Sequence, residues 1–284
     1  MFKNNCCDGI YNSFDVHFTS ICDNRCAHCI DCKYEGKHIA KPNVDAIANA
    51  IISNSEGYDD VLFLGGEPCL FLPELIHCIQ LIKSATELKV YVTTSVPKTM
   101  HDNPQLLNDL LELVDGINLS VQHYKEDIAD KIRRTTSWYD RQAFYRAFPH
   151  KEKTRINLNI VKPFLYKKDD ILACLKHYDD MGFPEIKLSE IQYGSEYFVS
   201  FEKVMGIKLK SPYSHGCQTW VDMRQFIPGY RGRLLLKRSC FLCESTLKAS
   251  GMDFAKALYR AVTPKPQNKY GVVYEDGTIS KGWI

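Results

Sequence analysis

The sequence repeats one pattern six times: a short run rich in β-branched and aromatic residues, then a helical or polar segment. Strands are expected at residues 15–21, 61–64, 89–95, 116–122, 155–161 and 185–191, and helices near 44–52, 72–85, 104–113 and 169–181. Mostly apolar strands that alternate with helices form parallel sheets covered by helices. Right-handed crossovers without a reversal of strand order curl such a sheet toward a barrel, and an open doubly wound sheet is the alternative.

Polar and reactive residues follow the first four expected strands. The carboxyl ends of parallel strands meet at one face, where barrel active sites are assembled. The pattern therefore favours an α/β fold of the partial (β/α)6 barrel type.

The strand and helix pattern ends near residue 195. We therefore expect a barrel core over residues 1–195 and a smaller C-terminal extension over 196–284 that packs across the barrel mouth. Within the extension, a helix is expected near 252–262. Two alternating runs around Asp-Gly at 271–280 are typical of a β-hairpin.

Charge and hydropathy exclude some classes of protein. The net charge is +2, from 36 basic and 34 acidic residues, so nothing demands a nucleic acid partner. No stretch approaches the ~18 consecutive apolar residues of a membrane helix, and the N-terminus lacks the apolar core of a signal peptide. These observations predict a cytoplasmic protein without a membrane partner.

Twelve cysteines are many for a reducing compartment, where disulfides are rare. Clustered cysteines in that setting indicate metal binding or catalysis. Isolated Cys69, Cys78 and Cys174 stand in apolar context, and we expect them in the core.

Cys22, Cys26 and Cys29 follow the first strand with x3 and x2 spacing, so one loop can turn three sulfurs toward a single point. Thiolates are the usual ligands of zinc and of iron–sulfur clusters. A [4Fe–4S] cube on three thiolates would leave one iron open, whereas zinc would need a fourth ligand from elsewhere. The spacing alone does not decide between the two.

Gly65-Gly66-Glu67-Pro68 follows the second strand. Together, this run and the cysteine loop resemble the radical S-adenosylmethionine (SAM) enzymes. Their hallmark is CxxxCxΦC after strand one, with His28 here at the aromatic-type position, and Gly-Gly-Glu-Pro after strand two.

The resemblance implies a [4Fe–4S] cluster on Cys22, Cys26 and Cys29, with SAM chelated to the fourth iron. Reductive cleavage of SAM would form a 5′-deoxyadenosyl radical that abstracts hydrogen from a substrate, which is oxidoreductase or lyase-type chemistry. The electron would come from a donor such as flavodoxin or ferredoxin. Cys32 is then interpreted as a nearby free thiol.

The resemblance also suggests a SAM site at the strand ends. Glycines let a backbone approach a ligand closely, and Glu67 carries a charge suited to the methionine ammonium. Polar residues at later strand ends are expected to contact the methionine moiety or the ribose: Ser95, Ser120 and Gln122, with Asn159 a weaker candidate. Arg133 is either a partner of the SAM carboxylate or, the favoured reading, part of a solvated helix face.

A second cysteine group, Cys217 with Cys240-x2-Cys243, lies in the extension. The extension resembles the C-terminal auxiliary-cluster domains of the SPASM and twitch type. It departs from the shortened type because the lone cysteine precedes the CxxC pair. An auxiliary [4Fe–4S] cluster, a zinc site completed by His215, and free thiols are the three alternatives.

The substrate is expected to be a peptide, by the auxiliary-like extension, or a nucleotide or modified base. The nucleotide is suggested by basic residues interleaved with an aromatic one: Tyr230, Arg231, Arg233, Lys237 and Arg238. The net outcome is an oxidation, a crosslink, a rearrangement or a group transfer. The rival from another class is a zinc-binding, non-catalytic nucleic-acid-binding module, which would not explain Gly65-Gly66-Glu67-Pro68 or the six strand–helix units.

Overall fold

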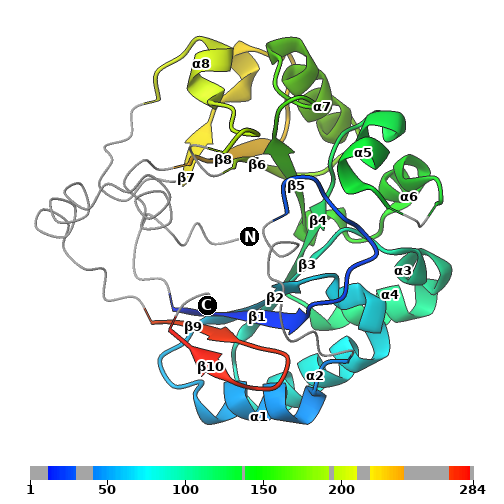
Figure 1. The fold of residues 1–284 in the computed structure, drawn as a ribbon, viewed down its shortest axis with the longest axis vertical. Helices are drawn as coiled ribbons and strands as arrows, with labels where there is room; N and C mark the ends of the chain where they lie inside the picture. Colours follow the sequence, from blue (N-terminus) through cyan, green and yellow to red (C-terminus); the bar gives the residue numbers. More distant parts are fainter. Residues whose placement is uncertain are drawn as a thin grey trace, which may run out of the picture.

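The computed structural model describes residues 12–29, 41–135, 138–191, 195–209, 218–239 and 269–281. These residues form one ten-stranded sheet in the order β10-β9-β1-β2-β3-β4-β5-β6-β8-β7. Figure 1 shows the sheet curving, with its helices on the outer side. The two end strands, β10 and β7, do not pair with each other among the described residues, so the barrel is partial, as predicted.

The six central strands are parallel and follow one another in chain order. They are β1 (Ser13–Thr19), β2 (Asp60–Gly65), β3 (Lys89–Thr94), β4 (Gly116–Ser120), β5 (Thr154–Ile160) and β6 (Glu185–Glu190). Each predicted strand is present. The absence of a reversal in strand order excludes the doubly wound alternative.

Helices connect these strands. They are α1 (Val44–Ser53), α2 (Leu72–Ala85), α3 (Lys98–Asp102), α4 (Pro104–Leu113), α5 (Glu126–Arg133), α6 (Arg141–Ala147), α7 (Lys168–Asp180) and α8 (Phe201–Met205). Asn43 caps α1 by accepting a hydrogen bond from the Ala46 N–H at 3.2 Å, which confirms the predicted start of that helix. No described helix combines the length and the apolar character that crossing a membrane requires.

The strands are amphipathic, and this decides where the core lies. In β1, Phe14, Val16 and Phe18 are fully buried and belong to one continuous apolar cluster that includes residues of α1 and α2. Successive side chains of a strand point to opposite faces. Asp15 and His17 therefore face the concave side of the sheet. Cys69, Cys78 and Cys174 are fully buried in the apolar cluster, as predicted.

The described strands of the C-terminal segment extend both ends of the sheet (Figure 1). They are β7 (Gln218–Val221), β8 (Arg233–Lys237), β9 (Tyr270–Val273) and β10 (Ile279–Ser280). β8 pairs in parallel with β6, and β9 pairs in parallel with β1. β9 and β10 form the predicted hairpin. The division of the chain at residue 195 stays a prediction, and the helix expected near 252–262 lies outside the described residues.

β1 ends two residues earlier than predicted, at Thr19. The carbonyls of Thr19 and Ile21 accept hydrogen bonds from the backbone N–H groups of Gly66 (2.7 Å) and Glu67 (2.8 Å). The chain after Thr19 therefore bonds to the loop that follows β2 rather than continuing the strand ladder.

Candidate active site

The cysteine loop follows β1 at the carboxyl edge of the sheet. Cys22 is exposed, and Cys26 and Cys29 are half-buried. The Cys29 N–H donates to the Cys26 carbonyl at 3.0 Å, so a tight turn holds these two cysteines. The Asn24 N–H donates to Cys22 Sγ at 3.4 Å. Desolvation by the surrounding residues and the negative charge of Glu67 raise the pKa of the Cys22 thiol.

Gly65, the last residue of β2, and Gly66 are required by the contact between two loops. A Cβ at Gly66 would lie 2.3 Å from the Ile21 carbonyl oxygen, far inside van der Waals contact. Gly65 has φ +115, a conformation that residues with a Cβ rarely adopt. In this structure the close backbone approach is to the cysteine loop, and it joins the two motifs.

The Glu67 carboxylate is turned inward. It is 1% exposed and accepts four hydrogen bonds from described residues. Oε1 accepts from the Thr94 hydroxyl at 2.6 Å and from the Cys69 N–H at 3.0 Å. Oε2 accepts from the N–H and the hydroxyl of Ser95, both at 2.6 Å. Burial raises the pKa of Glu67, and these hydrogen bonds oppose that rise.

Glu67 therefore links the loop after β2 to the end of β3. Its assignment to the methionine ammonium stays a prediction.

Ser95 also contacts the cysteine loop. Its hydroxyl accepts a hydrogen bond from Asn24 Nδ2 at 2.7 Å. Asn24 is 5% exposed and was not singled out from the sequence. Its position between two cysteines was the available signal, because a short amide side chain can hydrogen-bond locally in a loop.

A residue of β5 also reaches the cysteine loop. Asn159, on β5, donates from Nδ2 to His28 Nε2 at 3.0 Å. Burial lowers the pKa of His28, consistent with a neutral ring that accepts at Nε2. Ser120, half-buried, ends β4, and Gln122, 6% exposed, follows it at the same edge.

The C-terminus of α5 holds the cysteine loop from another side. The N–H groups of Arg25 and Ala27 donate to the carbonyls of Arg133 (2.7 Å) and Ile132 (3.1 Å). The last carbonyls of a helix have no partner within the helix, so the loop satisfies them.

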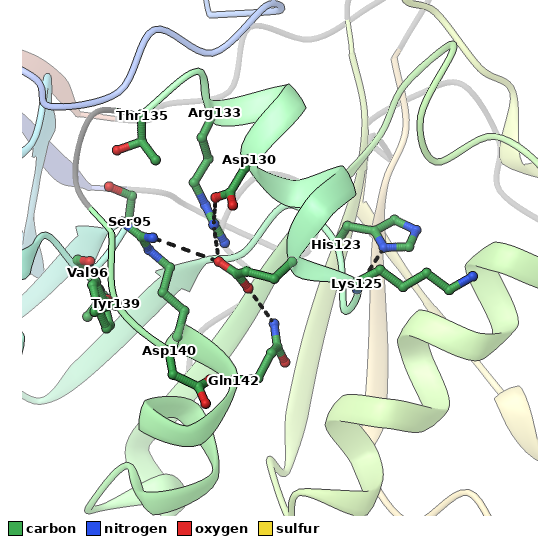
Figure 2. A network of polar contacts seen from close by, with 12 residues as sticks. Ser95, Val96, His123, Lys125, Asp130, Arg133, Thr135, Tyr139, Asp140 and Gln142 are labelled. Carbon is green, nitrogen blue, oxygen red and sulfur yellow. Dashed lines mark hydrogen bonds and ion pairs between the residues drawn. The ribbon is translucent and has the colours of Figure 1, made fainter.

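Arg133 itself is fully buried, so the prediction of a solvated helix face is wrong. Its Nη1 lies 2.7 Å from Glu126 Oε1 and 3.4 Å from Asp130 Oδ1. Figure 2 shows the guanidinium beside Asp130. The ion pairs and the cysteine loop over the helix end explain the burial. Nε and Nη2 have no hydrogen-bond partner among the described residues.

A second buried arginine, Arg141, stacks on the Tyr139 ring at 4.3 Å and was not predicted from the sequence.

The hairpin at the other end of the chain reaches the base of the cysteine loop. Glu275 Oε1 accepts from the Ser20 hydroxyl at 2.6 Å, and Oε2 lies 3.0 Å from His17 Nδ1. Burial opposes ionisation, but the hydrogen bonds from His17 and Ser20 outweigh it and lower the pKa of Glu275 to about 2.

Residues 16–189 match the family model of the radical SAM superfamily, which is more than half of the chain. The chain belongs to the radical SAM superfamily. Membership implies an enzyme that uses a [4Fe–4S] cluster and SAM.

Solved structures of radical SAM enzymes share this fold. Streptococcus suis SuiB bound to S-adenosylmethionine has a TM-score of 0.59 and 13% identity, covering 96% of this chain and 60% of that one. SuiB bound to its precursor peptide SuiA has a TM-score of 0.60 and 12% identity, covering 97% and 60%. The structure of anSMEcpe with AdoMet and the Cp18Cys peptide has a TM-score of 0.52 and 13% identity, covering 95% and 73%.

This chain thus spans 60% of the length of SuiB. A search of curated proteins finds no match.

The cysteine loop suits the radical SAM cluster. Within the part of the chain that the structure describes, no three Cys, His, Asp or Glu side chains are gathered to hold one metal ion. The thiolates of a four-iron cube bind three different irons, so they need not converge on one ion. Three cysteines on a single loop fit that requirement.

The second cysteine group, Cys217, Cys240 and Cys243, lies outside the described residues, as do His215 and Cys32. The strands beside this group are described: Gln218, at the start of β7, pairs with Lys237, at the end of β8. The Ser239 N–H donates to Glu190 Oε2 at 2.9 Å, which fixes the chain after β8 at the carboxyl end of β6.

Three arginines of the basic run near β8 contact carboxylates or a backbone carbonyl. The guanidinium of Arg231 donates to the Asp179 carbonyl at 2.8 Å, and that of Arg233 lies 2.8 Å from Glu185 Oε2. Arg238 is likewise paired, 3.2 Å from Glu202 Oε2. Tyr230 is 5% exposed, so its ring does not offer a stacking surface. Lys237 is exposed.

Proposed function

We propose that this radical SAM enzyme holds its [4Fe–4S] cluster on Cys22, Cys26 and Cys29 and acts on a peptide substrate. The chemistry that the cluster and SAM supply when bound is one-electron cleavage to a 5′-deoxyadenosyl radical, which abstracts a hydrogen atom from the substrate. The observation that carries the proposal is the bonded pair of motifs. The cysteine loop and the loop Gly65-Gly66-Glu67-Pro68 hydrogen-bond to each other at the carboxyl edge of the sheet.

The chain's own residues would orient SAM. Ser95, Ser120 and Gln122 lie at the carboxyl ends of the neighbouring parallel strands β3 and β4 and would contact its methionine moiety or ribose. Arg133 would hold the SAM carboxylate, because a buried guanidinium with two unpartnered nitrogens is costly unless an anion completes it.

A peptide substrate is favoured over a nucleotide by two observations. The guanidinium groups of Arg231, Arg233 and Arg238 already contact carboxylates or a backbone carbonyl, which makes them less available to a phosphate. SuiB and anSMEcpe, whose folds this chain shares, have been solved with a precursor peptide and a peptide, respectively.

We further propose that Cys217, Cys240 and Cys243 bind a second, auxiliary [4Fe–4S] cluster. The pairing of Gln218 with Lys237 supports this, because the chain enters β7 directly after Cys217 and approaches Cys240 soon after β8. A flavodoxin or ferredoxin would supply the electron. We propose that the protein works in the cytoplasm.

Anaerobic purification tests the proposal. The protein should be brown, with charge-transfer absorption that dithionite bleaches, and with SAM it should release 5′-deoxyadenosine. Replacing Cys22, Cys26 and Cys29 together by Ala should abolish this release, whereas Cys78→Ala, a core substitution, should retain it. A colourless protein with stoichiometric zinc, as the non-catalytic nucleic-acid-binding alternative requires, would contradict the proposal.

A further inference from the structure

Three buried or half-buried side chains connect the two radical SAM motifs in one line of hydrogen bonds. Asn24 Nδ2 donates to the Ser95 hydroxyl at 2.7 Å, and that hydroxyl donates to Glu67 Oε2 at 2.6 Å. The direction is fixed at both ends, because an amide NH2 only donates and a carboxylate only accepts. We call these three residues the Glu67–Ser95–Asn24 chain.

The Glu67–Ser95–Asn24 chain ends beside a cysteine sulfur. The backbone N–H of Asn24 donates to Cys22 Sγ at 3.4 Å. The second proton of Asn24 Nδ2 is directed to Asp23 Oδ1 at 3.1 Å, and the side chain is 5% exposed. The position of this N–H therefore depends on an anchored side chain and not on the loop backbone alone.

Hydrogen bonds to cluster sulfurs stabilise the more negative, reduced state and so tune the reduction potential. Hydrogen bonds in a line ending on a buried carboxylate strengthen one another, which stiffens the anchor.

We propose that Asn24 is a positioning residue: held by the Glu67–Ser95–Asn24 chain, it places its N–H on the Cys22 thiolate and raises the reduction potential of the cluster bound there. The inference rests on the proposed function, since it assumes a cluster on Cys22. In this inference the buried Glu67 carboxylate influences the cluster by anchoring Ser95 and Asn24.

Thr94 provides a matched control for Ser95. Thr94 and Ser95 each donate a hydroxyl hydrogen bond of 2.6 Å to Glu67, but to different oxygens, and only Ser95 also contacts Asn24. Thr94→Val and Ser95→Ala therefore each remove one hydroxyl hydrogen bond from the same carboxylate. The bond of Thr94 lies outside the Glu67–Ser95–Asn24 chain, and the bond of Ser95 lies within it.

The test is a redox titration followed by electron paramagnetic resonance. It uses the anaerobically reconstituted full chain without SAM, because Ser95 is also a proposed SAM contact. Every protein carries Cys217→Ala, Cys240→Ala and Cys243→Ala, so that only the cluster on the first cysteine loop contributes. Iron content and thermal unfolding are measured on the same samples.

We expect Asn24→Ala and Ser95→Ala to lower the midpoint potential by similar amounts, and the double variant to lower it no further than either alone. Ser95→Thr, which keeps the hydroxyl, should restore the potential. Thr94→Val should leave the potential unchanged even where it lowers the melting temperature as much as Ser95→Ala does.

Equal potentials in all variants would overturn this inference alone, as would a shift in Thr94→Val that matches Ser95→Ala. A reference protein that assembles no [4Fe–4S] cluster would overturn the proposed function and this inference with it.

Discussion

Ser20 donates a 2.6 Å hydrogen bond to Glu275, a residue 255 positions away in the sequence. The contact ties the C-terminal hairpin to the residue that begins the cysteine loop. His17, on β1, pairs with the other oxygen of the same carboxylate at 3.0 Å. The two ends of the described chain therefore meet at the site where the cluster is proposed to bind.

The lowered pKa of Glu275 predicts that the protein loses stability in acid. Its pKa is lowered from 4.5 to about 2, so its contribution to folding is present above about 4.5 and is lost as the pH falls toward about 2. Glu275→Gln should lower the melting temperature at pH 6, and the difference from the natural protein should shrink at pH 3. Thermal unfolding of the iron-free protein measures both. The same difference at the two pH values would contradict the shift.

Gly66 should not tolerate a Cβ. Gly66→Ala would place Cβ 2.3 Å from the Ile21 carbonyl oxygen, and separating the two loops should cost about 2–3 kcal/mol of unfolding free energy. It should also reduce iron binding. Gly182→Ala is the control: its φ of +88 costs about 1 kcal/mol in backbone strain, but no atom lies within 4 Å of the added Cβ. Urea unfolding and iron analysis compare the two variants, and intact iron binding in Gly66→Ala would count against the loop contact.

Arg133 should support both folding and SAM binding. Arg133→Met leaves the Glu126 and Asp130 carboxylates without their buried partner, for a cost of about 2–3 kcal/mol. If Arg133 holds the SAM carboxylate, the dissociation constant of SAM should rise about tenfold or more. The neighbouring Arg134 is exposed, so Arg134→Met should change stability by less than about 0.5 kcal/mol and leave SAM binding unchanged. Unaltered SAM affinity in Arg133→Met, measured by calorimetry, would limit this residue to a structural role.

Iron content separates the interpretations of the second cysteine group. With an auxiliary cluster, the natural chain should bind about eight irons, and replacing Cys22, Cys26 and Cys29 by Ala should leave about four. Replacing Cys217, Cys240 and Cys243 instead should also leave about four. If the natural chain binds about four irons and the first variant binds almost none, there is a single cluster. One equivalent of zinc alongside that single cluster would favour a zinc site completed by His215.

The sequence by itself determined the partial barrel, the family and the position of the cysteine loop. These follow from local signals: the period-two pattern of each strand, the spacing of Cys22, Cys26 and Cys29, and the run Gly65-Gly66-Glu67-Pro68. It also placed Cys69 in the core, because an isolated cysteine in an apolar run is usually buried.

The tertiary structure alone decided what surrounds that loop. Arg133 reads as a surface residue in its charged helix, yet the ion pairs with Glu126 and the loop over the end of α5 bury it. The inward turn of Glu67 toward Ser95 and the contact of Glu275 with Ser20 join residues far apart in the chain. Such contacts depend on how elements meet in space, and no local pattern of charge or hydropathy encodes them.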